Sequence, residues 1–161
     1  MRESWIKYFV FQGLRKRHRK STDYSDCRNI GFVFTGQEES LILKDTLLKF
    51  FERDGKYVSC LEFRTGAPAP AEEEGVCFAA DFTFFGKLKN PYASSFLATP
   101  FDYLFCLDKN LSPALRYFMT HSQAHCRVGV AEEKPFFDII FLSKEKNETG
   151  NDIYNYIKKV N

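Results

Sequence analysis

The stretch NIGFVFTGQEESLILKDTLLKFFERDGKYVSCLEF, residues 29–63, decides the fold of this chain. Its first seven residues are short, apolar and rich in Phe, Ile and Val, which predicts a strand buried on both faces over Asn29–Thr35. Apolar residues then recur at helical spacing and predict a helix over Glu38–Arg53, which ends at Asp54-Gly55. A second strand is predicted over Tyr57–Phe63. Strand, helix and strand joined by short connections predict a right-handed crossover between parallel strands.

The same alternation continues to the C terminus. Gly66–Glu74 is predicted to be a loop, and residues 84–100, with turn signals such as Asn90-Pro91, are not assigned. Further strands are predicted over Val76–Phe82, Phe101–Leu107, His125–Val130 and Phe137–Leu142. Further helices are predicted from Ser112-Pro113, where serine caps and proline opens the first turn, and over Gly150–Val160. The pattern predicts an α/β fold: a Rossmann-like three-layer sandwich with a mostly parallel sheet of five or six strands.

The N-terminal part differs in composition from the rest. The apolar residues of the first twenty fall on one half of a helical wheel, which predicts a helix. Basic residues follow at its C-terminal end, where the helix dipole favours cations. We therefore expect residues 1–26 to form a basic helix and a linker, and residues 27–161 to form a single α/β domain. A length of 161 residues suits one domain.

Composition and cysteine usage indicate a folded protein in a reducing compartment. The 18 Phe and 8 Tyr residues argue against intrinsic disorder, because disordered chains are poor in aromatics. The five cysteines are odd in number and lack CxxC spacing, which favours reduced thiols and a cytoplasmic location. We find no secretory signal and no run of the ~20 apolar residues that a membrane span needs.

The strongest local feature is the segment Arg15–Lys20, called the basic run below. It has three interpretations. It is a solvated helix end, a binding site for RNA, the ribosome or another polyanion or acidic protein, or a contact for an anionic membrane surface. Its charges point all round the helix, whereas an interfacial helix segregates charge to one face, so the membrane is disfavoured. Lys and Arg in a row can contact phosphates with release of counterions, although no aromatics are interleaved with them. We favour a non-catalytic interaction domain that binds a polyanion through Arg15, Lys16, Arg17, Arg19 and Lys20.

The alternative function is an enzyme or small-ligand binder. Ligands of open parallel sheets bind beyond the C-terminal ends of the strands, which directs attention to Thr35, Asp108 and Asn110. The turn after the first strand has one glycine and so lacks a GxGxxG loop, and no GxxxxGK[ST] motif occurs. Glu38 and Glu39 would also repel a phosphate at the helix N-terminus. Asp108 and Asn110 are equally typical of turns and helix caps.

Metal binding and nucleophilic catalysis find little support. His121, His125 and Cys126 have spacing that can serve a metal on one helix face, but the predicted helix ends between the two histidines. No second ligand pair occurs, and no cysteine has a context that distinguishes it as a nucleophile. The sequence therefore predicts no metal, no cofactor and no identifiable catalytic residue.

Three stretches carry a resemblance to known proteins: FDYLFCLDKNLSPALRYFMTHSQAHCRVGV (residues 101–130), KYFVFQGLRKRHRK (residues 7–20) and NIGFVFT (residues 29–35). With them the chain resembles a small family of uncharacterised proteins from Bacteroidetes-type bacteria, which implies the domain boundary and no activity. The first stretch is more remotely similar to the N-terminal Rossmann-like half of heptosyltransferases. The matching residues are Phe101, Asp102, Leu107, Arg127, Val128 and Gly129. That resemblance implies a glycosyltransferase-like half domain that lacks the sugar-nucleotide half.

Overall fold

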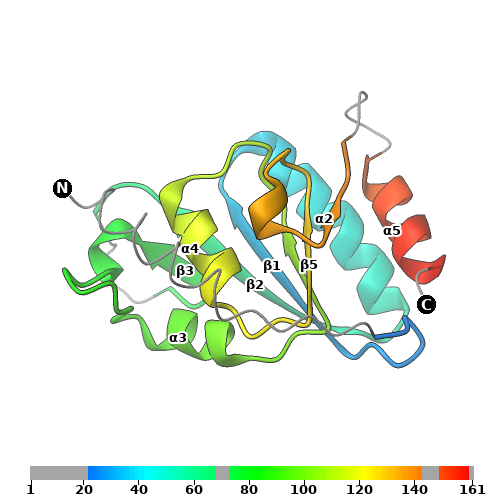
Figure 1. The fold of residues 1–161 in the computed structure, drawn as a ribbon, viewed down its shortest axis with the longest axis horizontal. Helices are drawn as coiled ribbons and strands as arrows, with labels where there is room; N and C mark the ends of the chain where they lie inside the picture. Colours follow the sequence, from blue (N-terminus) through cyan, green and yellow to red (C-terminus); the bar gives the residue numbers. More distant parts are fainter. Residues whose placement is uncertain (1–21, 68–72, 143–148, 160–161) are drawn as a thin grey trace.

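The computed structural model of the chain describes residues 22–67, 73–142 and 149–159, and the predicted basic helix lies outside these ranges (Figure 1). The strands are β1 (Asn29–Thr35), β2 (Tyr57–Arg64), β3 (Val76–Phe78), β4 (Tyr103–Cys106), β5 (Cys126–Gly129) and β6 (Ile139–Ile140). The helices are α2 (Glu38–Arg53), α3 (Pro91–Ala98), α4 (Pro113–His121) and α5 (Thr149–Lys159). Short 3-10 turns, η1 (Ala79–Asp81) and η2 (Lys134–Phe136), follow β3 and precede β6.

The six strands form one sheet in the order β3-β2-β1-β4-β5-β6, and every neighbouring pair is parallel. The chain moves outward from β1 to β3, returns to the other side of β1 with β4, and continues outward to β6. This order confirms the Rossmann-like α/β prediction. It also places the topological switch point, where such sheets bind ligands, between β1 and β4.

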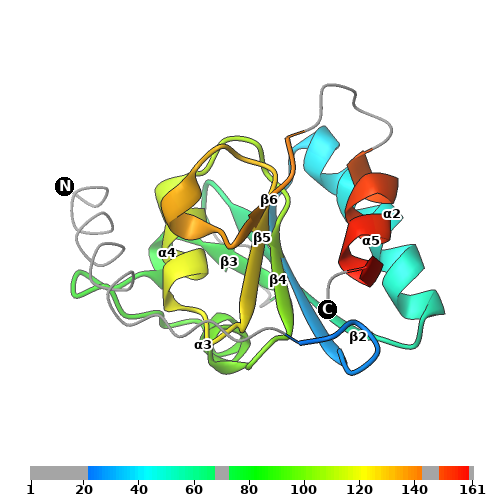
Figure 2. The ribbon, with the colours of Figure 1, turned by 45° about the vertical axis from the view of Figure 1, so that its right-hand side comes forward.

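Helices cover both faces of the sheet. Figure 2 shows α2 and α5 on one side of the strands, with α3 and α4 on the other. Alternate residues of β1 enter different cores: Phe32 packs with Phe51 of α2, whereas Val33 packs in the cluster that contains Phe118 of α4. All four side chains are fully buried. The apolar run of β1 thus faces a helix layer on each side, as its composition predicts.

Helix caps explain one correct prediction and one helix in a segment that the sequence analysis left unassigned. Ser112 Oγ accepts a hydrogen bond from the backbone N–H of Leu115 at 3.2 Å, and α4 begins at Pro113 as predicted. Asn90 does the same for α3, accepting from the N–H of Ala93 at 3.1 Å. The Asn90-Pro91 pair, in the unassigned segment 84–100, therefore starts a helix, because an asparagine cap followed by proline acts like a serine cap followed by proline.

Two predicted strands are shorter than their sequence pattern. The predicted strand Val76–Phe82 stops at Phe78, because the Asp81 carboxylate accepts the Phe78 N–H at 2.7 Å and turns the chain into η1. The predicted strand Phe137–Leu142 pairs with β5 only over Ile139–Ile140. Both lie at the edges of the sheet, where the apolar segment is longer than the part of it that pairs with a neighbouring strand.

A hydrogen-bonded cluster joins the segment before β1 to the ends of α2 and α5. The hydroxyls of Tyr24 and Tyr154 each donate to Asp54 Oδ2 at 2.6 Å. Burial tends to raise the pKa of Asp54, but the hydrogen bonds from Tyr154 and Tyr24 outweigh it, so the pKa lies below its ordinary value. Asp54 thus stabilises the fold in its ionised form.

We expect Asp54→Asn to lower the free energy of unfolding at pH 7 by about 1 kcal/mol, since the amide replaces a charged acceptor. A lowered folded-state pKa means that the contribution is complete above the unfolded-state pKa and is lost as the pH falls through the folded-state value. The difference in the free energy of unfolding between wild type and variant should therefore shrink below about pH 4. Urea unfolding at pH 7 and pH 3 measures this difference. An equal difference at both values would contradict the role of the ionised carboxylate, and Tyr24→Phe provides a control that keeps the charge.

Candidate functional site

The candidate site lies at the switch point of the sheet, where β1 and β4 end side by side. Val33 of β1 pairs with Cys106 of β4, so Thr35 and Asp108 leave the sheet next to each other. Helix α2 begins three residues after Thr35 and directs its N-terminus at the same place. Backbone N–H groups and the helix dipole favour a negative group there.

The negative group at this place is Asp108. Its side chain is almost completely buried, with the residue only 1% exposed. Its Oδ1 accepts hydrogen bonds from the Thr35 N–H at 3.0 Å and from the Ser40 hydroxyl at 2.7 Å. Its Oδ2 accepts from the Thr35 hydroxyl at 2.5 Å. The carboxylate therefore lies at the edge of the sheet where ligands of open parallel sheets bind, and it accepts three hydrogen bonds from the chain itself.

The structure brings two of the three predicted edge residues together. Thr35 and Asp108 are bonded directly, whereas Asn110 is exposed in the loop before α4 and is not one of the three donors to Asp108. Ser40, the third residue of α2, was missed by sequence reasoning, because its acceptor Asp108 lies 68 residues away in the chain. Above this network, Lys109 Nζ pairs with Glu39 Oε2 at 3.3 Å and links the two loops.

The histidines and cysteines of the described residues do not converge. The ring of His121 stacks on the ring of Tyr117. His125 Nδ1 lies 3.8 Å from Asp102 Oδ1, at the end of β4 opposite to Asp108. Within residues 22–67, 73–142 and 149–159, no group of three or more His, Cys, Asp or Glu side chains could hold a metal ion. No helix in these ranges is long and apolar enough to cross a bilayer.

Burial raises the pKa values of four of the cysteine thiols, those of Cys27, Cys60, Cys77 and Cys106. All five cysteines are free, and four of them are buried. Burial raises the pKa of Cys27 to about 12, with a further contribution from the nearby Asp102 carboxylate. Burial likewise raises the pKa of Cys77 to about 12 and raises the pKa of Cys106. Thiols of this kind are inert, because the thiolate is the nucleophile.

Exposed aromatics gather at one turn. Phe84 and Phe85 are 61% and 74% exposed, and their rings lie edge to face with centroids 5.6 Å apart. The turn is held by hydrogen bonds from the Thr83 N–H to the Lys87 carbonyl, 2.8 Å, and from the Tyr117 hydroxyl to the Gly86 carbonyl, 2.7 Å. The polyanion-binding residues predicted from the sequence, Arg15, Lys16, Arg17, Arg19 and Lys20, lie outside the described residues.

Comparison with curated proteins and with solved structures gave no match. A model of a protein family, described as a family of unknown function (DUF6913), matches residues 2–159. This agrees with the expected membership of an uncharacterised family, whereas the bacterial group and the heptosyltransferase relationship stay predictions. Because the match includes both the basic run and the whole described domain, the chain belongs to the DUF6913 family of unknown function.

Proposed function

We propose that this protein is a non-catalytic interaction domain that docks on RNA, alone or in a ribosome, through its N-terminal basic run. The distribution of charge supports the proposal. Residues 1–21 hold seven of the 23 basic residues and one of the 21 acidic ones, a net charge of +6, so the remaining residues carry −4. A polyanion is attracted to one segment of the chain and repelled by the other.

The exposed aromatic turn supports RNA over a polyanion without bases. Phe84 and Phe85 are followed by Lys87 and Lys89, which are both exposed. Aromatic rings stack on bases while neighbouring lysines contact phosphates, a combination typical of surfaces that bind single strands. The turn supplies the aromatics that the basic run lacks.

The Asp108 network supports a non-catalytic role over the alternative of an enzyme or small-ligand binder. Its three donors are already bonded to a buried carboxylate that belongs to the chain. A ligand anion at the α2 N-terminus would meet this charge and would have to displace it. The conclusion rests chiefly on the separation of charge between residues 1–21 and the folded domain.

The proposal is tested by fluorescence anisotropy with a labelled single-stranded RNA over a series of salt concentrations. We expect Arg15→Ala/Arg17→Ala/Arg19→Ala to weaken binding and to reduce the slope of log K against log salt by about 2, since each lost phosphate contact removes about 0.7. Lys49→Ala/Lys134→Ala/Lys159→Ala removes equal charge from exposed positions of the domain and should leave the slope unchanged. Equal affinity and slope for the arginine variant and wild type would refute the proposal. So would a wild-type protein that ignores RNA and binds anionic vesicles.

A second variant tests the aromatic turn. Phe84→Ala/Phe85→Ala should weaken RNA binding by roughly tenfold or more, because stacking is worth about 1–3 kcal/mol per base. Binding to inorganic polyphosphate, which has no bases, should not change. A parallel loss for both polymers would exclude stacking by this turn.

A further inference from the structure

The crossover from β2 to β3 contains no helix among its described residues. The connections β1–β2 and β4–β5 each contain a helix, α2 and α4. The connection from β2 to β3 spans only residues 65–75, and its described residues are in no helix. A helical crossover between parallel strands needs a dozen or more residues. The described residues of this connection therefore place no helix beside α2 over β2, where a crossover helix would otherwise lie.

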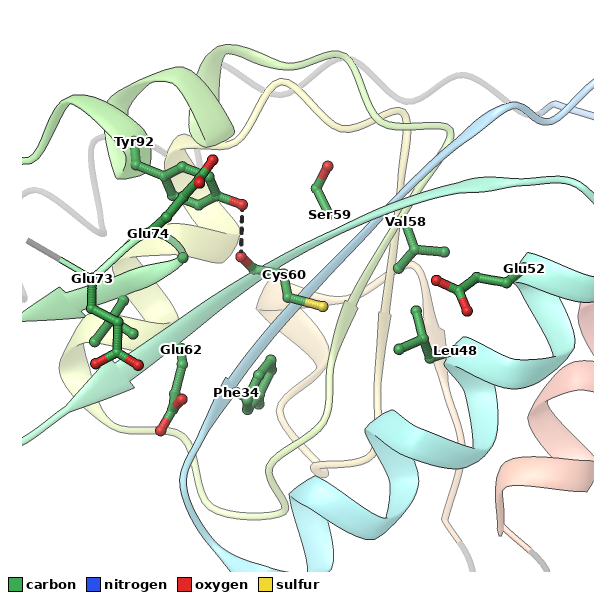
Figure 3. A pocket seen from close by; sticks show the side chains of 12 residues that line it. Phe34, Leu48, Glu52, Val58, Ser59, Cys60, Glu62, Glu73, Glu74 and Tyr92 are labelled. Atoms are coloured by element: carbon green, nitrogen blue, oxygen red, sulfur yellow. Dashed lines mark hydrogen bonds between the residues drawn. The ribbon is translucent and has the colours of Figure 1, made fainter.

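A groove occupies this place (Figure 3). Its volume is about 490 Å³, and it lies between α2 and the strands β2 and β3. The apolar part of its lining consists of Phe34, Leu48, Val58, Cys60, Val76 and Tyr92. Val58 and Cys60 are only partly buried although β2 is an interior strand. The Tyr92 hydroxyl donates to the Cys60 carbonyl at 3.0 Å and borders the groove on the side of α3.

The rim of the groove is acidic. Its charged residues are Glu52, Glu62, Glu73 and Glu74. Glu62 and Glu73 share Arg64, with N–O distances of 2.8 Å to each. Glu52 and Glu74 are exposed and form no ion pair with another described residue. Lys44 Nζ lies 5.6 Å from the centroid of the Phe34 ring. The described residues that line the groove contain four carboxylates and no Lys or Arg, so the rim is acidic.

We propose that this groove binds an amphipathic helix of a partner protein that carries Lys or Arg beside its apolar face. The apolar face would cover Val58 and Cys60, and the basic side chains would reach Glu52 and Glu74 at the rim. Such a helix would lie beside α2 over β2 and would extend the layer that α2 begins. Its charge is complementary to that of the rim, which a polyanion would not be. The groove is therefore separate from the basic run, and the proposal for one can be refuted without the proposal for the other.

The probe is a fluorescein-labelled amphipathic peptide of Leu and Lys at helical spacing, compared with the same peptide carrying Glu in place of Lys. We expect the Leu–Lys peptide alone to bind, and Glu52→Lys/Glu74→Lys to weaken its binding by about tenfold or more, which corresponds to about 1.4 kcal/mol. Glu132→Lys/Asp152→Lys makes the same change in net charge at exposed positions elsewhere and should retain the affinity within about twofold. Equal affinity for both peptides, or equal losses in both variants, would overturn the proposal.

Cys60 reports whether the peptide sits in the groove. It is the one partly exposed cysteine, and burial raises the pKa of its thiol, so alkylation by N-ethylmaleimide will be slow and will favour this position. Saturating Leu–Lys peptide should slow alkylation of Cys60, measured by peptide mass spectrometry, by about fivefold or more. An unchanged rate overturns the proposal. Protection by RNA, or protection that rises with protein concentration alone, also overturns it, because RNA or a second copy would then occupy the groove.

Discussion

Replacing Asp108 by Ala lowers the free energy of unfolding by about 3–5 kcal/mol, the largest loss that we expect at any polar residue of the domain. The substitution leaves the N–H and hydroxyl of Thr35 and the hydroxyl of Ser40 without their acceptor. Water cannot readily replace the carboxylate, because the residue is only 1% exposed. Each buried donor without a partner costs about 1–3 kcal/mol. Urea unfolding at pH 7, followed by circular dichroism, measures the loss.

Three variants serve as controls for this result. Asp108→Asn keeps one acceptor oxygen and should lose less than the Ala variant. Ser40→Ala and Thr35→Val each remove one hydroxyl and should cost about 1 kcal/mol. An Asp108→Ala protein that unfolds like wild type would mean that the carboxylate does not hold the α2 N-terminus against β4. The alternative of a small-ligand binder at this edge of the sheet would then regain support.

Gly129→Ala is expected to be the most damaging small substitution, with a loss of about 3 kcal/mol. A Cβ at Gly129 of β5 would lie 2.5 Å from ring atoms of Phe137, a buried side chain that packs directly on the strand. The backbone of Gly129 has no positive φ, so the close approach of the ring, not the conformation, requires glycine. Either the ring or β5 must move, and both lie in a packed interior. Thermal unfolding detects the loss.

A double variant tests this explanation. Phe137→Leu removes the ring atoms that a Cβ at Gly129 would meet, so Gly129→Ala should cost much less in that background than in wild type. Simple additivity of the two losses would contradict the packing argument. Gly36→Ala is the matched control, because its Cβ would meet only the flexible end of Glu62, at 3.1 Å. We expect it to change stability by less than about 1 kcal/mol.

Local chemistry explains which elements the sequence predicts well. The bounds of α2 agree with the prediction at both ends, and β1 and the start of α4 agree as well. The spacing of apolar residues, the helix caps and the glycines that end helices all depend on residues close in sequence. They can therefore be recognised from the sequence alone. Asn90-Pro91 also had a local signal, but residues 84–100 were left unassigned because the same dipeptide serves turns and helix starts.

The candidate site shows where local reasoning stops. Sequence position placed Thr35 and Asp108 at the same edge of the sheet, and whether Asp108 caps a loop or receives a ligand was open. Only the pairing of β1 with β4 decides it, by bringing Asp108 to Thr35 and Ser40, which lie 73 and 68 residues away in the chain. The basic run was evident from composition, because charge needs no partner to be recognised.

The sequence thus determined that strands and amphipathic helices alternate, that the strands are parallel and buried, and that positive charge is concentrated before the domain. Tertiary structure alone decided the strand order, the closure of the switch point by Asp108 and the groove between α2 and the strands β2 and β3. The physical reason is the range of the interactions. Periodicity and caps depend on neighbours within about one or two helical turns, whereas a buried hydrogen-bond network or an uncovered sheet face depends on segments that meet only after the chain has folded.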